Sequence, residues 1–221
     1  MPGPLAAIGR TYDHLFARVY DRVLAGPERA GLGRAREGLL AGASGRVLEI
    51  GAGTGANLAH LAHLARTGIV SLSLVEPAAP MRARLAHRVA ALRDHLPEET
   101  HVVDGSAAAI PVADGTVDTL VSTLVLCSVP DLDDAVRELR RVLAPDGHLL
   151  LLEHVAGTGR TRRLQGMIDP GWRVVARGCR LVRDTRAALE SGGFDTSEVA
   201  DWRMPGGGVT GPALLGTARP R

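Results

Sequence analysis

The fold is most clearly indicated by one segment, Arg46-Val47-Leu48-Glu49-Ile50-Gly51-Ala52-Gly53-Thr54-Gly55. Its apolar run predicts a buried strand, the three glycines at alternate positions predict a tight turn, and residues 56–65 predict a helix. This order of elements forms the nucleotide-binding turn of open α/β sheets. Glycine permits a positive φ and lets a ligand lie against the backbone, while the helix start offers N–H groups to an anion.

The glycine spacing alone does not identify the ligand, because Gly51, Gly53 and Ala56 also fit a dinucleotide fingerprint. Glu49 favours a different ligand, since a carboxylate at the end of a buried strand needs a partner and a ligand ammonium would supply one. The stretch resembles the first motif of the class I S-adenosylmethionine (SAM)-dependent methyltransferases. That resemblance implies SAM as the cofactor and the following cofactor-binding residues: Glu49, Gly51, Ala52, Gly53 and Gly55.

The composition predicts a single domain in a reducing compartment. The chain has 221 residues, of which 45% are hydrophobic, and no shift in composition marks a second domain. It has no apolar run of roughly 18 residues and no apolar signal-peptide core near its start, so we expect a cytoplasmic protein without a transmembrane segment.

The two cysteines, Cys127 and Cys179, are too few for a disulfide framework or a metal cluster, and no metal is predicted. Cys127 has no histidine within twenty residues in the sequence, which favours a small buried side chain over a nucleophile.

All 26 basic residues are arginine. The absence of lysine excludes Schiff-base chemistry, covalently bound pyridoxal phosphate and a phosphate-loop lysine. A net charge of +2 and an aromatic content of 3% leave little material for base stacking, so we expect no nucleic-acid partner. We expect a monomer or a homodimer.

Residues 5–24 place apolar side chains at spacings of three and four, which predicts an amphipathic helix. Gly26-Pro27 is expected to end it, and a second helix is expected over 28–40. The first helix either packs passively on the sheet or covers the site. Residues 16–21 (Phe-Ala-Arg-Val-Tyr-Asp) resemble the N-terminal segment of the ubiquinone and menaquinone C-methyltransferases, which implies a helical lid over 1–42 with Tyr20 at the cofactor.

Ile69–Val75 reads as a second strand that ends in Glu76-Pro77. Glu76 lies about twenty residues beyond the glycine loop, the spacing at which an acid reaches ribose hydroxyls in such folds. The methyltransferase resemblance implies the same role for Glu76 and places Pro77 beside it, whereas the alternative is a solvated acid. In the following helix, predicted over 80–93, Met81 either touches the adenosyl group or packs in the core.

A third short strand over 101–103 precedes a loop that ends at Pro111. Similar methyltransferases carry Gly-Asp-Ala-x-x-Leu-Pro there, with the acid at the adenine amino group. Counting back from Pro111, Ser106 takes the place of that acid, between Gly105 and Ala107. A serine hydroxyl accepts the same hydrogen bond without adding charge.

Residues 117–123 predict a fourth strand. Leu124, which follows it, is expected to bind the cofactor, and it begins the segment at the carboxyl end where an acceptor would approach. A charged amphipathic helix over 132–143 and a strand over 148–153 follow, and the strand ends in Glu153-His154. Residues 136–155 closely resemble the ubiquinone-type methyltransferases and the methyltransferase-like proteins with a type 11 domain. The resemblance covers 46–155, which we expect to be the SAM-binding core.

Residues 156–183 hold seven arginines against Asp169 alone, and we expect a substrate-side insertion. This local excess of positive charge has three alternative interpretations: a pocket wall for an anionic substrate, a phospholipid-facing surface or a solvated face. Residues 184–221 read as a closing helix and two strands around a glycine-rich turn, an antiparallel hairpin that a plain dinucleotide fold lacks.

The sequence therefore predicts one α/β domain over 1–221, with a seven-stranded, mostly parallel, Rossmann-like sheet, helices on both faces and a C-terminal hairpin. The resemblance implies methyl transfer from SAM to a small-molecule acceptor, anionic or lipid-like in one reading. His154 is the candidate general base, needed only if the acceptor holds its proton tightly. Two alternatives stay open: an NAD(P)-dependent oxidoreductase and a SAM-binding protein that transfers no methyl group.

Overall fold

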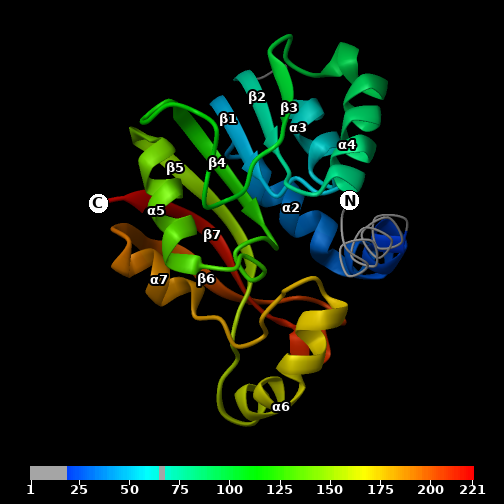
Figure 1. The fold of residues 1–221 in the computed structure, drawn as a ribbon, viewed down its shortest axis with the longest axis vertical. Helices are drawn as coiled ribbons and strands as arrows, with labels where there is room; N and C mark the ends of the chain where they lie inside the picture. Colours follow the sequence, from blue (N-terminus) through cyan, green and yellow to red (C-terminus); the bar gives the residue numbers. More distant parts are fainter. Residues whose placement is uncertain (1–18, 65–67) are drawn as a thin grey trace, which may run out of the picture.

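The computed structural model describes residues 19–64 and 68–221, which build a seven-stranded sheet (Figure 1). The strands are β1 (Gly45–Ile50), β2 (Ile69–Val75), β3 (Thr100–Val103), β4 (Val117–Thr123), β5 (Leu143–His154), β6 (Phe194–Arg203) and β7 (Pro212–Pro220). Their spatial order is β3-β2-β1-β4-β5-β7-β6. The predicted sheet is confirmed.

Strands β1 to β5 are parallel, and β6 and β7 form an antiparallel hairpin that joins the sheet through β5. β1 lies between β2 and β4, with Leu48 opposite Ser73 on one side and Leu120 on the other. The strand order reverses at β1 and β4, which is where open α/β sheets bind ligands. The carboxyl ends of the five parallel strands meet at one edge, which we call the carboxyl edge.

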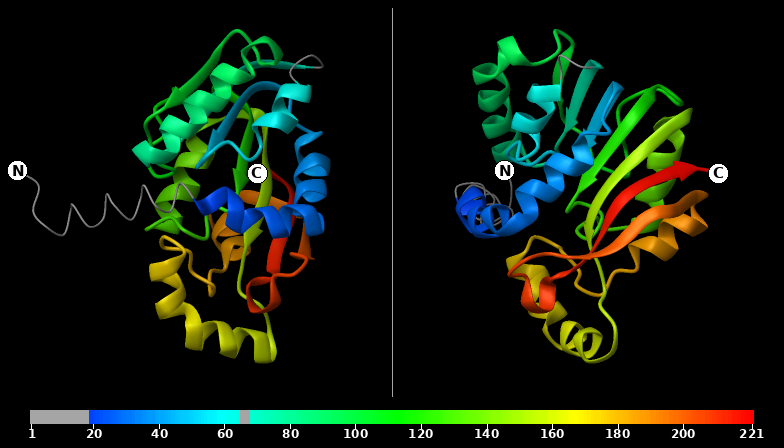
Figure 2. Two further views of the ribbon diagram at one scale, coloured as in Figure 1. Left: turned by 90° about the vertical axis from the view of Figure 1, so that its right-hand side faces the viewer. Right: turned by 180° about the vertical axis from the view of Figure 1, so that it is seen from behind.

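Helices cover both faces of the sheet (Figure 2). The helical segments with defined bounds are η1 (Glu28–Leu32), α2 (Gly33–Leu40), α3 (Leu58–Leu64), α4 (Ala79–Ala91), η2 (Arg93–His95), α5 (Leu132–Val142), α6 (Gly159–Val175), α7 (Thr185–Ser191) and η3 (Gly208–Thr210). Helices α2, α3 and α4 contribute Leu40, Leu61 and Leu85 to one core. Helices α5 and α7 contribute Leu139 and Leu189 to the core on the opposite face.

Two details of the fold differ from the sequence expectations. The chain stays helical from residue 19 through Pro27, which has φ −52° and ψ −42°, so the expected end of the first helix there is wrong. Pro27 is the residue that directly precedes η1, and the irregularity falls instead at Gly31, whose φ is 143°. Helix α6 was not foreseen, and it lies off the end of the sheet beside the turn between β6 and β7 (Figure 1).

Candidate active site

The glycine loop after β1 combines tight packing with open space for a ligand. A Cβ atom on Gly51 would lie 2.6 Å from a Val125 methyl group, and one on Gly55 would lie 2.9 Å from a leucine of α4. Gly53 has φ 59°, and its nearest neighbours would be the Gly51 oxygen at 3.8 Å and Tyr20 Cε1 at 4.0 Å. Gly51 and Gly55 are therefore needed for packing. The open space beside Gly53, which we call the Gly53 cradle, would be filled by a side chain at that position.

Glu49 lies at the carboxyl end of β1 with its side chain almost fully buried. Its Oε1 accepts a hydrogen bond from Asn57 Nδ2 at 2.9 Å, but its buried Oε2 has no partner within the described residues. Burial raises the pKa of Glu49 to about 7, although the Asn57 hydrogen bond and the Arg36 charge oppose the rise. A buried carboxylate oxygen without a partner beside a glycine loop fits an ammonium group from a ligand.

Residues that no motif marks hold Glu49 and Asn57 in place. Arg36 of α2 is buried and donates from Nη1 to Asn57 Oδ1 and to Thr123 Oγ1, each at 2.8 Å. Its Nε donates to Glu28 Oε1 at 3.0 Å. No local pattern distinguishes Arg36 from the other arginines of the chain, because its burial follows from the docking of α2 on the sheet.

Glu76 at the tip of β2 lies against the glycine loop. Its Oε2 accepts from the Gly53 amide at 2.9 Å, and its Oε1 accepts from the Ala78 amide at 2.8 Å. Burial raises the pKa of Glu76, and these two hydrogen bonds oppose the rise. Arg82 of α4 donates to the carbonyls of Glu76 and Pro77, each at 2.8 Å, which fixes the strand tip. The carboxylate therefore borders the Gly53 cradle, as a ribose ligand requires.

The loop after β3 is a compact turn. A Cβ atom on Gly105 would lie 2.8 Å from Pro111 Cδ, so this glycine serves packing. The backbones of Ser106 and Ala109 bond to each other at 3.4 and 3.1 Å, and Ala107 is buried in the core. The turn places Ser106 at the carboxyl edge beside β2, where the adenine contact is predicted.

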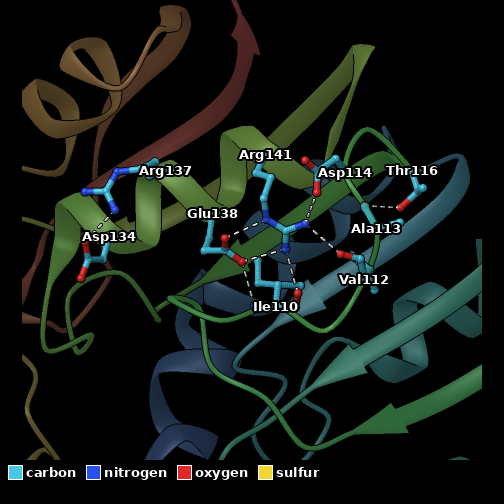
Figure 3. Close-up of polar contacts among 9 residues, drawn as sticks. All are labelled: Ile110, Val112, Ala113, Asp114, Thr116, Asp134, Arg137, Glu138 and Arg141. Atoms are coloured by element: carbon cyan, nitrogen blue, oxygen red, sulfur yellow. Dashed lines mark hydrogen bonds and ion pairs between the residues drawn. The ribbon is translucent and has the colours of Figure 1, made fainter.

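Arg141 of α5 clamps the continuation of this loop (Figure 3). It donates to the carbonyls of Ile110 and Val112, each at 2.9 Å, and pairs with Asp114 at 2.6 Å and Glu138 at 2.8 Å. Glu138 in turn accepts from the Ile110 amide at 3.0 Å. The hydrogen bond from Arg141 holds the pKa of Glu138 below its ordinary value. These bonds hold the loop that follows the predicted adenine contact.

The segment after β4 is held in a strained shape by a buried carboxylate. Leu124 has φ 61°, which is uncommon for a residue with a side chain and often marks a functional site. Glu153 is fully buried, and its Oε1 accepts from Ser122 Oγ at 2.7 Å and from the Val125 amide at 2.8 Å. Its Oε2 accepts from the Cys127 amide at 3.3 Å. Burial raises the pKa of Glu153, and these hydrogen bonds oppose the rise.

His154 follows at the end of β5 and is buried beside both cysteines. Its Nδ1 lies 3.6 Å from Cys179 Sγ, and its Nε2 has no partner among the residues that the structure describes. One donor atom from each of Cys127, His154 and Cys179 lies within 4.8 Å of the others. Cys127 is buried as expected, but the fold brings next to it a histidine that the sequence separation hid. Hydrogen bonds from Cys127 and His154 hold the pKa of Cys179 below its ordinary value.

The described end of the N-terminal segment contacts the glycine loop. Asp21 accepts from Thr54 Oγ1 and from Arg88 Nη2, each at 2.6 Å. Tyr20 lies over the loop, and burial raises its pKa to about 12. The first 18 residues of the predicted lid, Phe16 included, lie outside the described residues.

These features fit SAM, whose ammonium group suits Glu49, whose ribose suits Glu76 and whose chain can lie against Gly53. Met81 is buried in the first turn of α4, next to the strand tip that carries Glu76. Fold and site together define a class I SAM-dependent methyltransferase. The chain belongs to this family, as comparisons with known proteins show.

Residues 48–151 match the family model described as a methyltransferase domain. The human thiol S-methyltransferase TMT1A is 34% identical over 194 residues, which are 86% of this chain and 76% of that protein. The ubiquinone/menaquinone biosynthesis C-methyltransferase UbiE of Rubrivivax gelatinosus is 35% identical over 107 residues, 48% of this chain and 38% of that protein.

Solved structures confirm the fold. A SAM-dependent methyltransferase from Thermotoga maritima superimposes with a TM-score of 0.66 at 20% identity, covering 94% of this chain and 99% of the other. Geranyl diphosphate C-methyltransferase from Streptomyces coelicolor, solved with S-adenosyl-L-homocysteine, has the same TM-score of 0.66 at 15% identity, covering 86% and 80% of the two chains.

The protein is therefore an enzyme that transfers the methyl group of SAM to a small-molecule acceptor, and the oxidoreductase alternative finds no support. None of the helices within 19–64 and 68–221 is long and apolar enough to span a membrane. The role of each individual site residue remains a prediction.

Proposed function

We propose that the acceptor is a small-molecule thiol, methylated on sulfur. The observation that carries the proposal is the cluster at the end of β5, where the buried His154 Nε2 has no partner in the described chain and both cysteines lie alongside. A buried imidazole nitrogen without a partner is a candidate base, and a thiol is an acceptor whose proton has to leave before it attacks. Two relatives support the same reading: human TMT1A, and human TMT1B at 37% identity over 170 residues, are both thiol S-methyltransferases.

Bound SAM supplies a methyl group that is already activated on a sulfonium. The residues of this chain have to hold the cofactor, align the acceptor and exclude water. Glu49, Gly53 and Glu76 do the first, and Tyr20 shields the loop. A thiol reacts as its thiolate, so its proton has to leave, and Nε2 of His154 is the group proposed to take it.

A matched pair of acceptors tests the proposal. The enzyme is incubated with methyl-deuterated SAM and either hexanethiol or hexanol, and the products are identified by mass spectrometry. We expect label in the thioether and none in the ether. Label in the ether but none in the thioether, or turnover with other acceptor classes but not with a panel of thiols, would exclude a thiol S-methyltransferase.

We also propose that the acceptor is lipid-like and arrives from an anionic lipid surface through α6. Helix α6 is amphipathic, but its polar side faces the protein and its apolar side faces outward. Gln165 is fully buried and donates to the Val155 and Val209 carbonyls at 3.3 and 3.1 Å, while Asp169 accepts from the Leu181 amide at 2.7 Å.

The outward side of α6 carries large apolar side chains. Their exposed fractions are 43% for Leu164, 78% for Met167, 38% for Ile168, 74% for Val174 and 66% for Val175. Arginines at 160, 162, 163 and 173 flank them on the same helix. An apolar face bordered by arginines is the composition of a helix that lies in a membrane interface.

Vesicle sedimentation tests this surface. Met167→Glu should reduce binding to vesicles containing phosphatidylglycerol, because it places a charge in the apolar face. Val70→Glu changes a similarly exposed apolar residue, 67% exposed on β2, and should leave binding unchanged. Equal binding of the wild type to neutral and anionic vesicles, or none to either, would contradict the proposal.

The remaining assignments are proposals of the same kind. Residues 1–42 act as a lid, 46–155 as the SAM-binding core, 156–183 as the substrate-side insertion and 184–221 as the closing unit. The unbridged thiols of Cys127 and Cys179 support a cytoplasmic, reducing location. Whether the enzyme is a monomer or a homodimer stays a prediction.

A further inference from the structure

The cluster of Cys127, His154 and Cys179 has the dimensions of a metal site. The three donor atoms lie within 4.8 Å of one another, and Cys179 Sγ lies 3.6 Å from His154 Nδ1. In a tetrahedral zinc site, bonds of about 2.3 Å to sulfur and about 2.0 Å to nitrogen place these two atoms roughly 3.5 Å apart. The spacing therefore leaves room for an ion between the donors without movement of the backbone.

We propose that Cys127, His154 and Cys179 bind one Zn²⁺ ion, and that the fourth coordination position takes the sulfur of the acceptor. This inference rests on the proposed thiol acceptor. Three protein ligands with one open position are typical of a catalytic zinc site, whereas structural sites are closed by four. The expectation of no metal came from counting cysteines, and a count along the sequence leaves out the histidine that the fold adds.

The backbone ties the segments that carry the three ligands to one another. The Cys127 amide donates to Glu153 Oε2 at 3.3 Å, and the Cys127 carbonyl accepts from the Arg180 amide at 2.9 Å. The Cys179 amide donates to the Ala176 carbonyl at 3.1 Å. His154 belongs to β5 and pairs with β7. Donors held in this way lose little freedom when an ion binds, which favours binding.

The surroundings suit thiolate ligands and an open position. Two thiolates and a neutral imidazole balance the charge of Zn²⁺. Arg183 is buried nearby, and its Nε has no partner within the described residues. Cys127 and His154 are buried, and Cys179 is half-buried, so the cluster reaches solvent on the side of Cys179.

The site gives the thiol acceptor a direct route to its reactive form. Metal binding releases the two cysteine protons to solvent, and the acceptor binds as a thiolate after losing its own proton to solvent. The acceptor sulfur then forms a bond to the methyl carbon while the bond from that carbon to the sulfonium sulfur breaks. The resulting thioether is uncharged and a weaker ligand, so it leaves. When zinc is bound, His154 is a ligand of the ion, so the acceptor proton goes to solvent and not to His154 Nε2 as in the metal-free route proposed above.

Cobalt substitution tests the site by a readout separate from turnover. The whole protein is stripped with a chelator under a phosphine reductant and titrated with Co²⁺. We expect thiolate-to-cobalt charge-transfer absorption that saturates at one ion per chain. Cys127→Ser and Cys179→Ser should each abolish it. His148→Ala removes a histidine of the same strand that bonds to the Gly42 carbonyl, and it should leave the absorption unchanged. Far-ultraviolet circular dichroism establishes that each variant is folded.

The open position is tested by adding 2-mercaptoethanol or ethylene glycol to the cobalt protein. The thiol should shift the charge-transfer absorption, and the glycol should not. Absence of stoichiometric cobalt, unchanged binding in the folded cysteine variants, or purified protein whose mass shows a Cys127–Cys179 disulfide and no metal would overturn the proposal. Methylation of thiols without metal would reject the zinc site alone, whereas metal binding with methylation only of alcohols would reject the thiol acceptor alone.

Discussion

The carboxyl edge consists of two halves that are built differently. The cofactor half comprises the glycine loop, Glu49, Glu76 and the loop after β3, and backbone amides and rigid ion pairs hold its polar groups. The acceptor half comprises residues 124–131, His154 and 177–183, and it contains two thiols, an imidazole and apolar side chains. The cofactor half follows from short motifs at the ends of β1, β2 and β3, whereas the acceptor half depends on segments that only the fold brings together.

Two buried arginines illustrate the contrast. Arg36 supports the cofactor half and bonds to Glu28, Asn57 and Thr123. Arg183 lies in the acceptor half, where its Nη2 donates to the Val129 carbonyl but its Nε has no partner in the described chain. Burial lowers the pKa of Arg183. The side chains that support the cofactor half are thus bonded before the cofactor binds and leave Glu49 Oε2 for its ammonium, whereas in the acceptor half the supporting arginine itself has an unpartnered atom.

The largest expected effect is a loss of SAM binding when Gly53, in the cofactor half, is replaced. Gly53→Val should weaken SAM binding more than about 100-fold, because a branched side chain would fill the cradle. Gly115 is the matched control: its φ is 65°, and a Cβ atom there would meet nothing within 4 Å. Gly115→Val carries similar backbone strain and should bind SAM normally in a calorimetric titration. Equal losses in both variants would mean that strain, and not the cradle, determines the effect.

The next effect is a pH dependence of SAM binding set by Glu49. With a pKa of about 7, Glu49 is mostly neutral at pH 6 and mostly ionised at pH 8. Only the carboxylate pairs with an ammonium, so affinity should rise about tenfold across this interval. Glu49→Gln should remove most of the dependence and bind more weakly. A wild-type affinity that falls as the pH rises would contradict the pairing.

The same raised pKa has a consequence for stability. Because it lies above the ordinary value of 4.5, the contribution of Glu49 to stability is complete below pH 4.5 and is lost as the pH rises through about 7. Glu49→Gln should therefore gain melting temperature relative to the wild type above pH 7, measured without SAM.

The smallest expected effect concerns Ser106. Ser106→Asp should bind SAM within about threefold of the wild type or more tightly, since a carboxylate accepts the adenine amino group more strongly than a hydroxyl. Ala109→Asp adds the same charge to an exposed position of the same loop and should not tighten binding. A large loss in Ser106→Asp alone would show that the adenine does not lie against this side chain.

The sequence allowed the fold and most of the cofactor half to be predicted, because those residues follow strand ends at fixed spacings. Glu76 and the glycine loop lie together at the carboxyl edge as expected. The support from Arg36 and Asn57 could not be foreseen, since it depends on the docking of α2. Helix α6 was missed because Gly166, Pro170 and Gly171 interrupt its pattern, and the meeting of Cys127 with Cys179 depends on the path of the chain after that helix.

The division of the edge into two halves is tested most directly by titrating SAM into two variants. Glu76→Ala should bind SAM about 10- to 100-fold more weakly, because a charge-assisted hydrogen-bond acceptor is lost. His154→Asn should bind SAM within about twofold of the wild type while losing methyl transfer, because His154 serves only the acceptor. Wild-type SAM affinity in Glu76→Ala, or a loss of SAM affinity in His154→Asn that matches its loss of turnover, would contradict the division.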